Sequence, residues 1–164
     1  MTWIVRPIEE QDISGFHEAL DIVSRERKYL AFLEAPPFES TASFIRNNIS
    51  EDHPQFVAVA NGVIVGWCDV LPARPNTTHS HSGVLGIGII PEFRGKGLGR
   101  ELMKQTIAKA HAKGLTRIEL TVREDNLNAV ALYKKLGFVV EGTKRNGVRV
   151  DGVYENLLLM GLLS

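Results

Sequence analysis

The chain has 164 residues, of which 44% are hydrophobic and 23% are charged, as in an ordinary globular protein. Its 19 basic and 19 acidic residues cancel, so we expect no partnership with nucleic acid or an anionic membrane. The length fits a single domain over residues 1–164. The apolar runs are too short to cross a bilayer, the N-terminal residues carry no signal segment, and Cys68 is the one cysteine. We therefore predict a cytoplasmic protein without an intrachain disulfide.

The first half of the chain predicts two helices and a hairpin. Pro36 and Pro37 separate the two helical segments, and Asn61-Gly62 between two apolar runs is the strongest short hairpin signal. Apolar spacing near 3.6 residues marks the helices, and alternation marks the strands. In chain order, the expected elements are a strand at Trp3–Arg6, a helix from its N-cap Asp12 to about Leu30, a helix from Ser40 to about Ile49, and strands at Phe56–Ala60 and Val63–Val70.

The second half predicts strand–helix units followed by a final strand pair. The turn signals Asn146-Gly147 and Asp151-Gly152 separate the last two strands, and Lys113-Gly114 ends a helix. This order predicts an α/β (α+β) fold with a mixed, largely antiparallel sheet and helices on its faces. The expected elements are a strand at Val84–Ile90, a helix whose buried face holds Leu98, Leu102, Ile107 and Ala110, a strand at Arg117–Val122, a helix from Asn126 to Leu136, and strands at Phe138–Glu141 and Val153–Met160.

The stretch PEFRGKGLGRELMKQ places Gly95, Gly97 and Gly99 at alternate positions at the start of a helix. Glycine inside a helix start costs roughly 0.5–1 kcal/mol relative to alanine, so three glycines need a physical reason. A glycine-rich turn presents backbone N–H groups with no Cβ in the way, and the helix dipole adds partial positive charge there. Arg94 and Lys96 add full charges. The turn therefore predicts an anion site, and a diphosphate is the expected anion.

Two common diphosphate motifs do not match this turn. A Walker A loop needs glycine where Ile90 stands and Ser or Thr where Gly97 follows the lysine. The dinucleotide fingerprint needs a third glycine where Arg100 stands. These mismatches disfavour nucleotide hydrolysis and hydride transfer.

The pattern R-x-x-G-x-G that does fit runs from Arg94 to Gly99, after IGIIPEF, and resembles the acetyl-CoA loop of the GNAT superfamily of N-acetyltransferases. The segment DNLNAVALYKKLGF resembles the family's N-x-x-A-x-x-x-Y-x-x-x-G-F block, and the closing DGVYENLLLM is similar to the amino-acid and ribosomal-protein acetyltransferases. The resemblance implies a sheet of six or seven strands, splayed at its central strands and flanked by about four helices. It also implies acetyl-CoA as cosubstrate, direct attack by an amine, and a homodimer.

The resemblance assigns roles residue by residue. The amide of Ile87 or Ile89 would face the thioester carbonyl as an oxyanion donor. Asn126 would bind the cosubstrate, with a pure N-cap as the alternative. Tyr133 would protonate the leaving thiolate, with an amphipathic core tyrosine as the alternative. The implied cosubstrate-binding residues are Ile87, Gly88, Ile89, Arg94, Gly95, Lys96, Gly97, Leu98, Gly99, Arg100, Asn126 and Tyr133.

The base that deprotonates the amine is less defined. Thr121 stands where the ribosomal-protein branch carries a glutamate, and Glu119 projects from the same strand face two residues earlier. We expect Glu119 to act as the base through a water molecule, and a solvated or salt-bridged glutamate is the alternative. His79 and His81 are further candidates. They lack a third ligand at recognisable spacing, so we expect no metal.

The acceptor is expected to be a small primary amine such as an amino acid. Its contacts are predicted from SRERKYLAFLEAPPFES and from the final hairpin around Tyr154 and Glu155. Two alternatives stay open: an enzyme that acetylates protein N-termini or lysines, and a non-catalytic module that senses acetyl-CoA.

Overall fold

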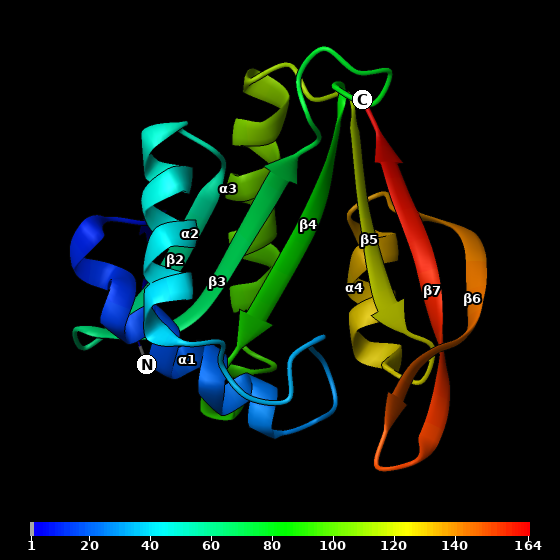
Figure 1. The fold of residues 1–164 in the computed structure, drawn as a ribbon, viewed down its shortest axis with the longest axis horizontal. Coiled ribbons are helices and arrows are strands. Elements are labelled where there is room, and N and C mark those ends of the chain that lie inside the picture. Colours follow the sequence, from blue (N-terminus) through cyan, green and yellow to red (C-terminus); the bar gives the residue numbers. More distant parts are fainter. Residues whose placement is uncertain (1) are drawn as a thin grey trace.

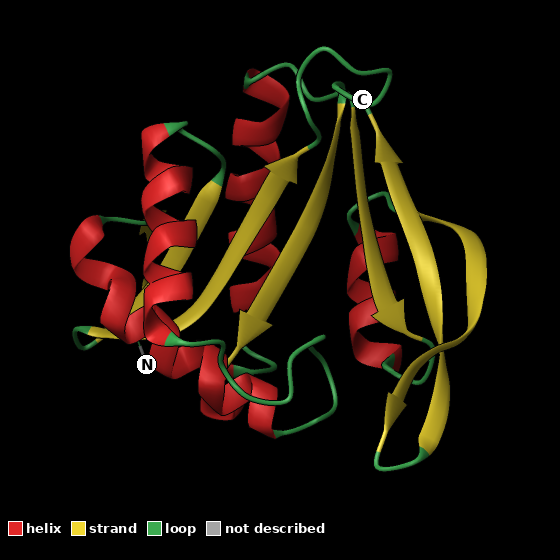
Figure 2. Ribbon diagram, in the orientation of Figure 1, coloured by secondary structure: helices red, strands yellow, loops and turns green. Residues whose placement is uncertain are grey.

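A computed structural model describes residues 2–164 and shows one seven-stranded sheet flanked by four α-helices (Figures 1 and 2). Two short 3-10 helices, η1 and η2, precede α1 and α3. In chain order the elements are β1 (Ile4–Pro7), η1 (Glu10–Asp12), α1 (Ile13–Arg25), α2 (Phe38–Ser50), β2 (Gln55–Ala60), β3 (Val63–Pro72), β4 (Ser82–Ile89), η2 (Pro91–Phe93), α3 (Leu98–Ala112), β5 (Arg117–Arg123), α4 (Leu127–Lys135), β6 (Val139–Val150) and β7 (Val153–Leu163).

The sheet has the order β1-β2-β3-β4-β5-β7-β6 and is antiparallel except between β4 and β5. Those two strands pair only where Ser82–Val84 lies beside Arg117–Glu119. Beyond this point they diverge, and Figure 1 shows the gap widening toward the carboxyl ends of both strands. The predicted fold class, strand number, helix number and central splay are confirmed.

Helices cover both faces of the sheet. α1 and α2 lie on one face, and α3 and α4 lie on the other (Figure 1). On the α1 face the Trp67 ring packs against Phe16, with ring centroids 5.3 Å apart. On the opposite face Leu102 and Met103 of α3 are fully buried. Because β-strand side chains alternate, consecutive residues of β3 and β4 serve the two layers in turn.

The first helix is shorter than the sequence predicts. α1 ends at Arg25 rather than near Leu30, because Arg27 has a left-handed backbone (φ 62°) that a helix cannot continue through. Asp12 precedes α1, as predicted, but its carboxylate accepts bonds from Arg6 and the Glu9 amide instead of capping α1. The chain from position 26 to position 37 is therefore a loop. The second helix begins two residues earlier than predicted, at Phe38.

The last hairpin is longer than predicted. β6 continues from Val139 to Val150, and the register shifts between Lys144 and Val148. Asn146-Gly147 therefore forms a bulge within β6 and not a turn, and the prediction of a turn there was wrong. Asn146 in this bulge has a positive φ of 49°, which asparagine tolerates better than most residues. Asp151-Gly152 makes the turn, as predicted.

Smaller differences concern strand ends. β3 extends to Pro72, and β4 runs from Ser82 to Ile89 rather than from Val84 to Ile90.

None of the helices described in residues 2–164 has the length and apolar character that crossing a bilayer requires. Within the same residues, no three His, Cys, Asp or Glu side chains gather as metal ligands would.

Candidate active site

The gap between β4 and β5 leaves main-chain groups of β4 free. Ile90, directly after β4, donates its amide to the Val65 carbonyl of β3 at 3.0 Å. Because the N–H groups of an extended strand point alternately to opposite sides, the amides of Ile87 and Ile89 point away from β3 and into the gap. A cavity of about 690 Å³ occupies the gap, and Ile87, Gly88 and Ile89 line it. The placement agrees with an oxyanion donor on this strand, which stays a prediction.

The three glycines of the turn before α3 have two different structural reasons. Gly95 and Gly97 have φ values of +73° and +81°, in a region of backbone conformation that residues with a Cβ rarely adopt. Gly99 has ordinary backbone angles, but a Cβ there would lie 3.3 Å from Ile89 and 3.4 Å from Leu132 side-chain atoms. The first two glycines shape the turn, and the third lets α3 approach β4 and α4 closely.

The turn opens onto the same cavity. The first amides of α3 have no partner within the helix, so they are available to an anion, and the helix dipole favours one there. Lys96 is exposed and does not line the cavity. The turn residues that do line it are Arg94, Gly95, Gly97, Leu98, Gly99 and Arg100.

Arg94 has a structural partner that the sequence did not reveal. Its guanidinium forms a two-bond pair with Glu26 just after α1, with Nη1 donating to Oε2 at 2.8 Å. Its Nε donates to the Ile89 carbonyl at 2.9 Å, and its guanidinium lies 4.6 Å from the centre of the Tyr29 ring. The side chain thus joins the glycine turn, β4 and the α1–α2 loop. Its predicted contact with a phosphate stays a prediction.

α4 contributes two predicted residues to the cavity wall. Asn126 is the N-cap of α4, and its Oδ1 accepts a bond from the Ala129 amide at 3.3 Å. The cap uses one of the two lone pairs of this oxygen, and the amide NH₂ keeps both of its hydrogens for a ligand. Tyr133 also lines the cavity, is 8% exposed, and packs against Phe138. Burial raises the pKa of the Tyr133 phenol above its ordinary value, so the hydroxyl stays protonated.

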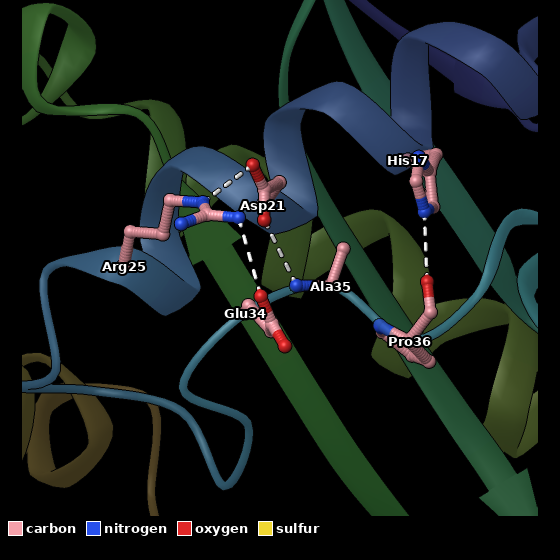
Figure 3. A network of polar contacts seen from close by, with 6 residues as sticks. All are labelled: His17, Asp21, Arg25, Glu34, Ala35 and Pro36. Carbon is pink, nitrogen blue, oxygen red and sulfur yellow. Dashed lines mark hydrogen bonds and ion pairs between the residues drawn. The ribbon is translucent and has the colours of Figure 1, made fainter.

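The α1–α2 loop is fastened to α1 by polar contacts (Figure 3). His17 donates to the Pro36 carbonyl at 2.8 Å, and Asp21 accepts from the Ala35 amide at 2.9 Å. Arg25 bonds to Asp21 and reaches Glu34 at 3.3 Å. The Ala35 amide, followed by Arg25, lowers the pKa of the Asp21 carboxyl, so the contacts persist at neutral pH. The other end of the loop lines the cavity with Tyr29, Leu30 and Ala31.

Comparison with known proteins agrees with this geometry. Residues 18–138 match the model of the acetyltransferase (GNAT) family. The chain belongs to this family. L-amino acid N-acetyltransferase AaaT of Escherichia coli (strain K12) is 36% identical over 107 residues, which make up 61% of this chain and 65% of that protein. The chain thus matches slightly less than two thirds of that relative's length.

Solved structures extend the likeness over the whole fold. An acetyltransferase of the GNAT family from Streptococcus pneumoniae is similar with a TM-score of 0.91 and 30% identity, over 99% of this chain and 100% of that one. The structure of yncA from Salmonella typhimurium, solved with its cofactor acetyl-CoA, has a TM-score of 0.91 at 19% identity, over 99% and 94% of the two chains.

The cavity of this GNAT protein fits acetyl-CoA. Gly95, Gly97 and Gly99 place no Cβ atom at alternate positions of the turn before α3, which allows close approach of a diphosphate to the backbone. The free amides of β4 form the wall next to the turn, where an extended amide-containing chain can pair with them. Asn126 and Tyr133 close the side formed by α4. Acetyl-CoA supplies an activated acetyl group as a thioester.

We expect Gly97→Val to weaken acetyl-CoA binding by about tenfold, because valine cannot hold φ at +81° and the amides would turn away. Gly62→Val is the matched control: Gly62 has φ +75°, has equal free space, and lies in the β2–β3 turn. Both variants should lose about 1–2 kcal/mol of stability. Isothermal titration with acetyl-CoA separates them. Equal affinity of the two variants would contradict an anion site at this turn.

Glu119 does not reach the cavity. Arg117 donates to its Oε2 from Nε at 3.1 Å and from Nη2 at 2.9 Å, and the same guanidinium pairs with Glu141. Glu119 lies opposite Val84, where β4 and β5 are still paired, whereas the following residues of β5, Thr121 among them, line the cavity. The salt-bridged alternative describes its contacts, and its role as a base stays an untested prediction.

Arg123 is a site residue that the sequence analysis missed. It lies at the end of β5, lines the cavity and is 5% exposed. Nη1 donates to the Arg27 carbonyl at 2.9 Å and Nη2 to the Leu30 carbonyl at 3.2 Å. Among residues 2–164 no carboxylate forms a salt bridge with it. Strand alternation from Thr121 places Arg123 on the same face of β5, and this signal could have identified it, although the neighbouring Glu124 and Asp125 are typical of a solvated strand end.

The two histidines, the one cysteine and Tyr154 are not among the residues that line the cavity. His79 and His81 lie in the exposed loop before β4. Cys68 is fully buried in β3, and burial raises the pKa of its thiol, so it is not an activated nucleophile. Tyr154 stacks near Arg149 on the β6–β7 hairpin.

Proposed function

We propose that this chain transfers the acetyl group of acetyl-CoA to a primary amine by direct attack, with both substrates bound together. The observation that supports this most is the gap between β4 and β5, where free amides, the glycine turn and Tyr133 meet in one cavity. The amide of Ile87 or Ile89 stabilises negative charge on the carbonyl oxygen, and one such donor contributes about 2.7–4 kcal/mol. Tyr133 donates its hydroxyl hydrogen toward the leaving sulfur.

The acceptor that best fits the cavity is an amino acid with an apolar side chain. Arg123 brings a nearly buried positive charge without a carboxylate partner in the described residues, and a buried charge is costly unless it is paired. The α-carboxylate of an amino acid would pair with it. Tyr29, Leu30 and Ala31 provide the apolar wall next to it. The L-amino acid N-acetyltransferase relative supports the same substrate class.

Matched pairs of acceptors test this proposal. We expect thiol release from acetyl-CoA to be about 10–100-fold faster with phenylalanine or methionine than with the corresponding amines that lack the carboxylate, as a charge-assisted bond of 1.5–3 kcal/mol predicts. Arg123→Met should remove this preference and leave acetyl-CoA affinity within about twofold. The melting temperature of the variant controls for loss of the loop contacts. Equal rates with both members of each pair would exclude carboxylate recognition.

Two other outcomes of the same assay decide between the alternatives. Turnover with peptides but not with free amino acids would make the chain a protein acetyltransferase. Tight acetyl-CoA binding without turnover across amino acids, polyamines, aminoglycosides and peptides would make it a sensor module.

The remaining parts of the proposal concern the whole protein. The resemblance to GNAT proteins supports a homodimer, the composition supports a cytoplasmic location, and the length supports one domain over residues 1–164. Sedimentation equilibrium tests the dimer: a mass near 18.2 kDa at micromolar concentration would exclude it.

A further inference from the structure

A carboxyl group lies buried on the α1 face of the sheet, one strand away from a residue that lines the cavity. Asp69 of β3 is 7% exposed and faces the same layer as Trp67, beneath α1 and α2. Its direct partner across the sheet is Gly86 of β4, which lines the cavity. A Cβ on Gly86 would lie 3.3 Å from Asp69 Oδ1. The missing side chain of Gly86 thus leaves Oδ1 facing the β4 edge of the cavity.

A chain of amides fixes the other oxygen of Asp69. Gln55 Nε2 donates to Asp69 Oδ2 at 3.3 Å, and Asn48 Nδ2 donates to Gln55 Oε1 at 2.9 Å. Asn48 Oδ1 is 3.3 Å from His53 Nδ1. Each amide is oriented by the next, so the Asp69 carboxyl has one oxygen held by the core and the other toward Gly86. Packing alone does not explain a buried carboxyl group whose one hydrogen-bond partner is a neutral amide.

The electrostatic surroundings of Asp69 contain no described counter-charge. Gln55 from β2 and Gly86 from β4 are neutral, Cys68 is the adjacent residue on the opposite face, and His53 is reached only through Asn48. Burial therefore raises the pKa of the Asp69 carboxyl to about 7. A base with that pKa can accept a proton near neutral pH and release it again.

We propose that Asp69 is the general base that takes the first proton from the acceptor ammonium group, directly or through one water molecule over Gly86. This proposal rests on the proposed function. The ammonium nitrogen gives one proton to Asp69, and its freed electron pair forms the bond to the acetyl carbon. The carbon–sulfur bond breaks with its electron pair on sulfur, and the Tyr133 hydroxyl donates its hydrogen to that sulfur while the second proton from nitrogen replaces it. Asp69 then returns the first proton to solvent.

At the gap, β5 offers no free carboxylate at the two positions where the sequence predicted a base. Glu119 is held by Arg117 outside the cavity, and Thr121 cannot act as a base. Asp69 approaches the gap from β3, the opposite side, and Gly86 makes the approach possible.

The first test is a direct titration of the carboxyl in the whole protein. With ¹³C-labelled aspartate, and Asp69→Asn to assign the signal, the Asp69 carboxyl should titrate with a midpoint near 7. Stability gives a second readout without activity. A raised carboxyl pKa means that the folded state binds more protons than the unfolded state between about pH 4 and pH 7, so wild-type stability should fall as pH rises through this window. Asp69→Asn should show a smaller slope. A midpoint near 4 would overturn the proposal.

The second test measures rates with the best amine acceptor. Asp69→Asn keeps the bond from Gln55 and should lower kcat/KM about 100-fold or more at pH 7, with acetyl-CoA affinity within about twofold. The variant rate should then rise tenfold per pH unit, because only the free amine reacts. Gly86→Ala keeps the carboxyl but places a methyl group between it and the cavity, so it should also slow the reaction.

Three outcomes are distinguished. Wild-type turnover with an unaffected Asp69→Asn variant overturns the base assignment alone. A loss confined to Glu119→Gln assigns the role to that residue and overturns the proposal. If the wild type turns over no amine while Asp69 titrates near 7, the proposed function is wrong and Asp69 is not a catalytic base. The raised pKa of the Asp69 carboxyl would then stand as a property of the fold alone.

Discussion

Tyr133→Phe should lower kcat about 10²–10⁴-fold, the usual contribution of a positioned acid, and should leave acetyl-CoA affinity within about twofold. The change removes one oxygen from a ring that lines the cavity and packs against Phe138. Burial raises the pKa of the phenol, so its proton is present throughout the working pH range. The same shift makes the phenol a weaker acid, so we expect it to act by donating a hydrogen bond to the sulfur as negative charge develops there.

Stability provides the control for this variant. The Tyr133 hydroxyl takes part in none of the hydrogen bonds between residues 2–164, so its loss should not lower the melting temperature. Single-turnover kinetics measured beside binding separates the two effects. An unchanged kcat would remove Tyr133 from the chemistry and leave it as a packing residue of α4.

Gly88→Ala should destabilise the fold by about 1–3 kcal/mol, the range expected for overpacking a filled core. A Cβ at this position would lie 2.2 Å from Cη2 and 2.3 Å from Cζ2 of Trp67. The ring cannot move aside easily, because it is 4% exposed and packs against Phe16. For a chain of this length, each kcal/mol lowers the melting temperature by about 2–4 °C.

Gly142→Ala is the matched control for Gly88→Ala. Gly142 also lies in a β-strand, and a Cβ there would meet no atom within 4 Å. Urea unfolding of both variants compares the free energies of unfolding directly. If the two variants had equal stability, the contact between β4 and the Trp67 ring would not limit the size of residue 88.

The sequence predicted those features that depend on local chemistry. Hydrophobic periodicity predicts the element order, and the spacing of Gly95 and Gly97 predicts a special turn, which their left-handed backbone angles confirm. Asn126 was predicted to cap α4, and its Oδ1 bond to Ala129 confirms this. The motif resemblance supplied the fold and the gap between β4 and β5, which residue periodicity alone does not reveal.

Contacts between distant residues could not be predicted. Arg94 meets Glu26 across 68 positions, and no local pattern connects them. α1 ends where it does because Arg27 adopts a positive φ, which its sequence propensity disfavours. In this conformation Arg27 forms a salt bridge with Asp151, 124 positions away. The sequence does contain a signal for Asp69, because it is the one charged residue in the predicted strand Val63–Val70.

In the proposed reaction the main chain of β4, and not its side chains, contacts the thioester, so binding and packing place separate demands on the same residues. The amides of Ile87 and Ile89 belong to any amino acid except proline, so binding of the thioester places no demand on these side chains. Their side chains pack against the core instead. A population of variants can therefore drift at these positions among apolar residues of similar volume without losing a donor. Under the same proposal, changes in the α1–α2 loop and at Arg123 would alter substrate preference while β4 stays unchanged.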